Sequence, residues 1–194
     1  MIDSNFTMYI ISSSRGYINF FIKFFISFSI LYFGTQIIIG LTVPNGYYSS
    51  FIVNYFNYPA ALRLYIFKGT RFLVSIFGFD TFSKDFYHIS FIKGSWIRLV
   101  YSCLGYGLLS CWIAFVFANN GKIVHKLKWL LAGCIIIWLL NILRVTLLLF
   151  GLNFHWPLLL TASHHLIFNI IVYIVIILMM SRFNRSVIIS PVNR

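Results

Sequence analysis

Four stretches of this chain are long enough and apolar enough to cross a lipid bilayer as helices. They cover residues 17–40, 101–118, 129–150 and 164–180, and a hydrocarbon core about 30 Å thick requires roughly 17–25 residues. The composition agrees, because 60% of the residues are hydrophobic and only 9% are charged, whereas a soluble domain has about 25% charged residues. We therefore expect an all-α integral membrane protein, a polytopic helical bundle that forms a single domain over residues 1–194.

The segment 43–100 does not follow this simple pattern. Its part 58–79 is apolar but contains three cations, each of which would cost about 2.5–3.5 kcal/mol near the middle of a spanning helix. These cations are Arg63, Lys68 and Arg71. We expect an interfacial helix or a re-entrant element here, followed by a short hairpin or an extended lid over residues 81–92. An additional spanning hairpin in this segment would raise the number of spans from four to six.

The distribution of lysine and arginine predicts the orientation. The loop 121–128 holds three lysines and the tail after Ser181 holds three arginines, so both should face the cytoplasm. Segment 43–100 then lies on the outer side of a cytoplasmic (inner) membrane. Fifteen basic and three acidic residues give a net charge of +12, but the charge is thinly spread. It therefore indicates topology and contact with anionic lipids, and we expect no nucleic-acid partner.

The acidic and cysteine residues limit the chemistry. The chain has three aspartates and no glutamate, which excludes zinc proteases of the His-Glu-x-x-His type. Its three cysteines form no Cys-x-x-Cys pair, so neither a disulfide framework nor a metal site is indicated. The adjacent pair His164–His165 is too weak a signal for a metal site by itself. We expect no cofactor.

Three chemically active side chains are predicted at one depth. Cys103 lies at the outer start of the second span. Arg144 lies 16 residues after Lys128, or about 24 Å along a helix, and His164 and His165 lie at the outer start of the fourth span. An intramembrane arginine usually faces a bundle interior or a wet cavity, although at this depth it could also reach outer phosphates. A nearby guanidinium would favour the nucleophilic thiolate of Cys103, although a cysteine is also often a small buried apolar residue.

At these positions the chain resembles the exosortase/archaeosortase family of membrane-embedded cysteine transpeptidases. Members have a cysteine at the outer start of one span, an Asn-x-x-Arg sequence on the next, and a histidine or arginine on the following one. The matching residues are Cys103, then Asn141 with Arg144, then His165. Gly105 is kept two residues after the cysteine, but Leu104 replaces the serine that many members have. The match covers residues 97–180.

The resemblance implies a peptidase and transpeptidase reaction on an exported protein with a C-terminal membrane tail. Cys103 would be the nucleophile, Arg144 would stabilise the oxyanion, and His165 would act as general acid and base. Since neighbours on a helix project about 100° apart, only one of the two histidines can easily face Arg144. We favour His165 because Asn169 follows one turn later on the same face. Further substrate contacts are expected from His164, Asn141 and Asn169.

A non-enzymatic alternative remains open. The chain could be a membrane scaffold or an export-partner subunit of a surface-polysaccharide system, in which Arg144 pairs with a lipid headgroup or a partner carboxylate. A transporter is disfavoured because the spans carry few polar residues at mid-depth. The reactivity of Cys103 separates the two main alternatives, because a catalytic thiolate reacts quickly and a buried structural thiol does not.

Overall fold

The computed structural model describes residues 4–43, 47–83, 85–92, 94–156 and 164–189. In chain order, its elements are the helices and strands α1 (Ser4–Thr42), α2 (Ser50–Tyr55), α3 (Tyr58–Ile76), β1 (Thr81–Ser83), β2 (His88–Phe91), β3 (Trp96–Arg98), the 3-10 turn η1 (Tyr101–Leu104), α4 (Tyr106–Ala118), α5 (Ile123–Asn153) and α7 (His164–Ile189). The expectation of an all-α membrane protein is confirmed, with one small sheet added.

Three helices in the described part of the chain are long and apolar enough to cross a membrane. They are Gly16–Thr42 in α1, Ile123–Asn153, and Phe168–Ser186 in α7. These helices correspond to three of the four predicted spans. The remaining prediction, the second span over 101–118, forms a helix only over Tyr106–Ala118. Thirteen residues reach about 20 Å, which is shorter than the hydrocarbon core.

The break in the predicted second span occurs at Gly105. This residue has φ 73° and ψ 15°, the left-handed conformation, which glycine adopts readily and residues with a side chain rarely adopt. Residues Tyr101–Leu104 before it form the separate turn η1. Cys103 therefore lies on a short turn and not in the first turn of a spanning helix.

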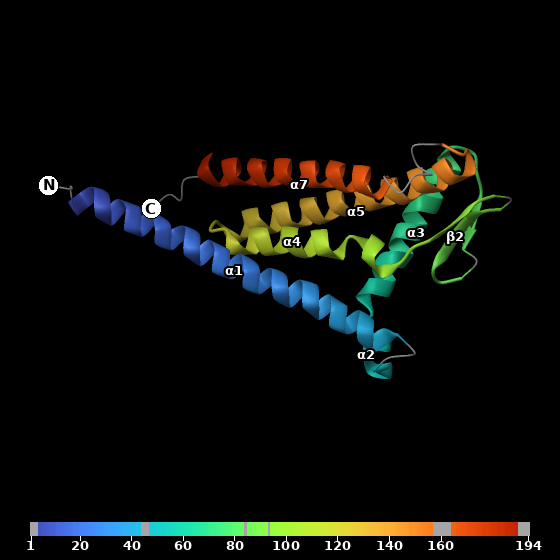
Figure 1. Cartoon of the computed structure of the whole chain (residues 1–194), viewed down its shortest axis with the longest axis horizontal. Helices are drawn as coiled ribbons and strands as arrows, with labels where there is room; N and C mark the ends of the chain where they lie inside the picture. The colour runs from blue at the N-terminus through green and yellow to red at the C-terminus, as the bar shows by residue number, and fades with distance from the viewer. Residues whose placement is uncertain (1–3, 44–46, 84, 93, 157–163, 190–194) are drawn as a thin grey trace.

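The arrangement in space agrees with the predicted topology. Helices α4, α5 and α7 run side by side along the long axis, α1 packs on α4 at an inclined angle, and α3 crosses the bundle near one end (Figure 1). The start of α1, the α4–α5 turn and the end of α7 all lie at the opposite end from the sheet. The lysine-rich loop and the start of the arginine-rich tail, which we expect in the cytoplasm, thus share one end of the bundle.

The core of the bundle forms where α4, α5 and α7 meet. Trp112 of α4 is fully buried and packs with Ile137 of α5 and Phe183 of α7. Gly133 of α5 makes this packing possible, because a side chain there would occupy the space of the Trp112 indole and the end of Met179. Burial of large apolar side chains supplies the attraction, and the absence of a side chain at Gly133 sets the separation of the helices.

The segment between α2 and α4 forms a compact outer layer. Helix α3 begins at Asn57, whose side chain accepts a hydrogen bond from the backbone N–H of Ala60 at 3.2 Å, as N-cap residues do. Strands β1, β2 and β3 form an antiparallel sheet in sequence order. We expected a short hairpin or an extended lid over 81–92, and the structure has the hairpin, in which β1 pairs with β2. β3 is a third strand that the sequence analysis did not predict.

A second apolar cluster joins this outer layer to the bundle. Its buried members come from α3, the sheet, η1 and α5, and they are Ile66, Phe67, Ile89, Leu99, Leu104, Ile142 and Val145. Cys103 and Trp138 pack against this cluster. The cluster therefore fixes the turn that carries Cys103 against the C-terminal half of α5.

Candidate functional site

Cys103 lies on a turn that α5 contacts directly. Its backbone N–H donates to the carbonyl of Val100 at 3.0 Å, and its side chain is half-buried against the second apolar cluster. We call residues 101–105 the Cys103 turn. Two α5 members of the cluster, Ile142 and Val145, flank Arg144 in the sequence. The tertiary structure thus places the predicted nucleophile beside the helical turn that carries the predicted arginine.

Asn141 of α5 lies against Gly105 of the Cys103 turn. Its amide occupies the space that a side chain on Gly105 would need, and its Nδ2 donates to the Ile137 carbonyl at 2.9 Å. Only 6% of its surface is exposed. We predicted Asn141 as a substrate contact, and the structure places it in packing contact with the turn that bears Cys103.

Arg144 lies on a neighbouring part of the same helical face. It is half-buried, and by the 3.6-residue period it projects about 60° from Asn141. Helices α5 and α7 are antiparallel, and Gly133 of α5 lies opposite Met179 of α7. Arg144 lies 11 residues, or roughly 16 Å, beyond Gly133 along α5. Because the helices are antiparallel, the residue of α7 at the same level lies 11 residues before Met179, which is Phe168. Arg144 is therefore level with the first turns of α7.

The fourth segment of the predicted site is described only in part. The backbone of α7 begins at His164, so His164 and His165 start this helix within about one turn of the level of Arg144. Their side chains lie outside the described residues. Asn169 is exposed on α7.

An apolar hollow approaches the Cys103 turn from the middle of the bundle. It has a volume of about 640 Å³ and lies between α1, α3, α4 and α5. Tyr106 and Trp138 line it, and both also pack against the cluster that holds Cys103. Thr35 and Tyr58 are joined by a hydrogen bond between their hydroxyls at its wall. The hollow offers an apolar surface that ends near the predicted nucleophile.

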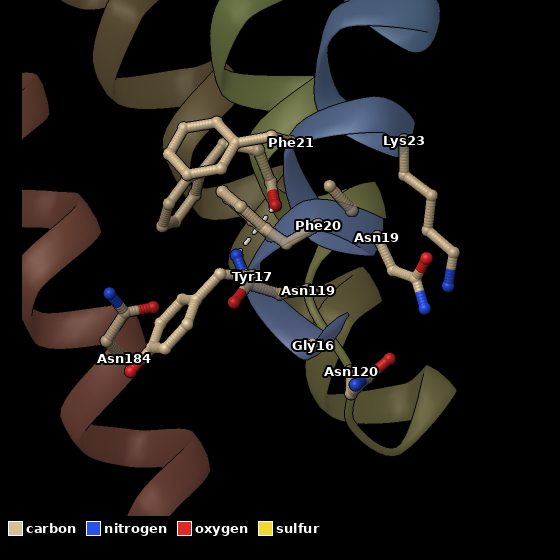
Figure 2. A pocket seen from close by; sticks show the side chains of 11 residues that line it. Gly16, Tyr17, Asn19, Phe20, Phe21, Lys23, Asn119, Asn120 and Asn184 are labelled. Atoms are coloured by element: carbon tan, nitrogen blue, oxygen red, sulfur yellow. Dashed lines mark hydrogen bonds between the residues drawn. The ribbon is translucent and has the colours of Figure 1, made fainter. Parts of the chain in front are cut away.

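A second hollow lies at the opposite end of the bundle. It has a volume of about 480 Å³ between α1, the end of α4 and α7. Figure 2 shows Tyr17 extending toward Asn184 of α7, with Lys23 and Asn19 further along α1. Asn119 donates a hydrogen bond to the Phe115 carbonyl at 2.8 Å beside it. Its polar lining fits the headgroup region at the predicted cytoplasmic end, and none of the predicted site residues lines it.

Arg63 is a residue whose environment the sequence analysis did not predict. We expected the three cations of segment 58–79 near the membrane surface, and Lys68 and Arg71 are exposed. Arg63, however, is 0% exposed. Within the described residues, none of its three side-chain nitrogens donates a hydrogen bond. A buried guanidinium without a polar partner normally costs several kcal/mol.

Aromatic rings compensate for the burial of this guanidinium. Its central carbon Cζ lies 4.2 Å from the ring centroids of both Tyr87 and Tyr101, and 5.1 Å from that of Phe86. A desolvated cation–π contact contributes up to about 2 kcal/mol. The planar guanidinium of arginine is also suited to stacking on aromatic faces. Tyr101 belongs to the Cys103 turn, so this cluster links α3 and the sheet to the predicted nucleophile.

The hairpin also contains a contact between His88 and Asp85 that was not predicted from the sequence. His88 Nδ1 lies 2.7 Å from Asp85 Oδ2, and its ring packs against Trp96. Side chains alternate along a strand, so His88 points away from the face on which Ile89 enters the Cys103 cluster. The His88–Asp85 pair therefore stabilises the hairpin and does not face Cys103.

This pair predicts how the hairpin responds to acid. The pKa of Asp85 lies below its ordinary 3.8, mainly because the Tyr87 backbone N–H donates to it and secondly because of the His88 side chain. A lowered folded-state pKa gives stability that is present above pH 3.8 and is lost as the pH falls through the folded value. Hydrogen–deuterium exchange should show protected Tyr87 and His88 amides above that pH. Asp85→Ala should lower the protection of these two amides several-fold, even at pH 7. Equal protection in the variant and the wild type would contradict this assignment.

Comparisons with known proteins identify no relative. No protein-family model matches the chain, and neither the curated proteins nor the solved structures give a match. Within the described residues, no three His, Cys, Asp or Glu side chains are grouped so that they could hold a metal ion.

Proposed function

We propose that this chain is a membrane-embedded cysteine peptidase and transpeptidase of the exosortase type. It acts on an exported protein with an apolar C-terminal tail, at the outer face of the cytoplasmic membrane. The observation that carries the proposal is the contact of Asn141 with Gly105, because it joins the Cys103 turn to the α5 turn that bears Arg144.

The proposed reaction is an acyl transfer through a thioester. The Cys103 thiolate attacks the carbonyl carbon of the scissile peptide bond, and Arg144 stabilises the negative charge that develops on the oxygen. The C–N bond then breaks, and His165 donates a proton to the leaving amine. An acceptor amine or water then attacks the thioester and gives up a proton to His165. The C–S bond breaks, and the Cys103 thiolate is restored. His164 is the alternative acid and base.

The apolar hollow supports the same substrate class. A membrane tail enters laterally between helices, and one face of a helical tail fits a groove lined by α1, α3, α4 and α5. The hollow ends at Tyr106 and Trp138, close to the Cys103 turn. This arrangement delivers the outer end of the tail to the nucleophile.

One observation favours the non-enzymatic alternative. Cys103 packs against an apolar cluster, as structural cysteines commonly do. In that case the chain would be a scaffold or an export partner, and Cys103 would react as slowly as the two cysteines within the bundle.

Thiol labelling separates the two functions without knowledge of the substrate. We expect a membrane-impermeant thiol reagent, added outside intact cells, to label a variant retaining only Cys103 at least about 10-fold faster than variants retaining only Cys111 or only Cys134. Arg144→Ala should slow the labelling of Cys103 several-fold, and Arg144→Lys should restore part of the rate. Labelling of Cys103 that is as slow as that of Cys111 would favour the scaffold.

A further inference from the structure

The aromatic cluster around Arg63 fixes one end of the Cys103 turn. Tyr101 is the first residue of η1 and lies two residues before Cys103. Its ring is stacked on the guanidinium of Arg63, whose other aromatic partners come from the segment leading into β2. The opposite end of the turn, Gly105, lies against Asn141. The turn is thus held by α3 at one end and by α5 at the other.

Arg63 is close enough to Tyr101 for its charge to act on the Tyr101 hydroxyl. Burial alone would raise the pKa of the Tyr101 hydroxyl, but hydrogen bonds with Tyr87 and Thr42, together with the charge of Arg63, lower it below its ordinary 10.0. In the described part of the chain Arg63 pairs with no carboxylate. The electron-rich tyrosine rings therefore take the place of an acidic partner.

We propose that Arg63 is a positioning residue that holds the Cys103 turn in the geometry needed for attack on the substrate. The proposal rests on the proposed cysteine peptidase function. Without the guanidinium, the Tyr101 ring loses the group that it stacks on. The start of the turn then loses this anchor, and the turn is held by the apolar packing of Leu104 and by the contact of Gly105 with Asn141. Cys103 would then move relative to Arg144, and a displacement of about 1 Å is enough to reduce a rate 100-fold.

Two measurements test this role in the full-length chain. The variants are Arg63→Met, Arg63→Lys and the matched control Arg71→Met, which changes an exposed cation of the same helix. We expect Arg63→Met to lower processing of a tailed substrate about 10- to 100-fold. In a background without Cys111 and Cys134, we expect it to raise the alkylation rate of Cys103 several-fold, because the half-buried thiol becomes more accessible. Arg63→Lys should recover part of both effects.

Further variants separate positioning from general unfolding. Labelling of a protein that retains only Cys134, which packs in the bundle core, should be unchanged by Arg63→Met. Tyr101→Phe keeps a ring face and should behave nearly like the wild type, whereas Tyr101→Ala should behave like Arg63→Met. If Arg63→Met matches Arg71→Met in both measurements, the positioning role is wrong. If the wild type processes no substrate, the peptidase proposal fails, and the labelling rates still decide whether Arg63 holds the turn.

Discussion

Replacing Cys103 by alanine is expected to abolish substrate processing while the protein still accumulates in the membrane. The substitution removes the atom that attacks the carbonyl, and loss of a catalytic nucleophile typically lowers kcat by about 10⁴-fold or more. Folding should change little, because Cys103 is only half-buried at the edge of its cluster. The measurement is co-expression with an exported protein that carries an apolar C-terminal tail, followed by detection of the shortened product.

Matched variants make this test specific. Cys111→Ala and Cys134→Ala should process normally, because neither residue lies on the Cys103 turn. Arg144→Ala should reduce processing about 10²- to 10³-fold, as loss of one oxyanion donor does. Comparison of His164→Ala with His165→Ala identifies the histidine that acts as acid and base. Processing that survives Cys103→Ala would disprove the nucleophile assignment.

The second large effect is expected at Gly133, where one added methyl group should disrupt the bundle core. In Gly133→Ala the new Cβ would meet Nε1 and Cε2 of Trp112. The Trp112 ring is rigid and fully buried, so the helices have to separate. Overpacking of this kind costs about 1–3 kcal/mol, and we expect a lower unfolding temperature of the detergent-solubilised protein.

Gly34→Ala is the matched control for this prediction. Gly34 also lies inside a helix, but a Cβ there meets nothing within 4 Å. The substitution should be neutral or should stabilise the protein by about 0.4–1 kcal/mol. Trp112→Leu should partly rescue Gly133→Ala, because it removes the indole ring atoms that the methyl group meets. If the changes in stability of the two single variants simply add in the double variant, the indole does not set the helix separation.

Parts of the fold that depend on composition and local pattern could be predicted from the sequence. Long apolar runs predict spanning helices because the lipid interior leaves few alternatives for the backbone. The lysine-rich loop and the arginine-rich tail predict a shared end of the bundle, and the structure agrees. The weak alternation of polar and aromatic residues over 81–92 left a hairpin and an extended lid open, and the structure has the hairpin.

Other features depend on contacts between distant residues. The break at Gly105 is accommodated by Asn141, a residue 36 positions away, and no local pattern reveals it. In the sequence, Arg63, Lys68 and Arg71 are alike, because each is a cation in the same apolar stretch. Of the three only Arg63 is buried, because the rings of Tyr87 and Tyr101, which are distant in the sequence, surround it. A sign that could have suggested this burial is the group of aromatic residues at 86, 87 and 101.

By itself, the sequence determined that this chain is a helical membrane protein and which residues carry reactive side chains, because hydropathy and residue chemistry are local properties. Only the tertiary structure decided that the Cys103 turn is separate from α4, that Asn141 packs against it, and that Arg63 holds its other end. These contacts arise when apolar faces of α3, α5 and the sheet pack into one cluster. Such packing depends on the shapes of side chains far apart in the chain, which local sequence patterns do not encode.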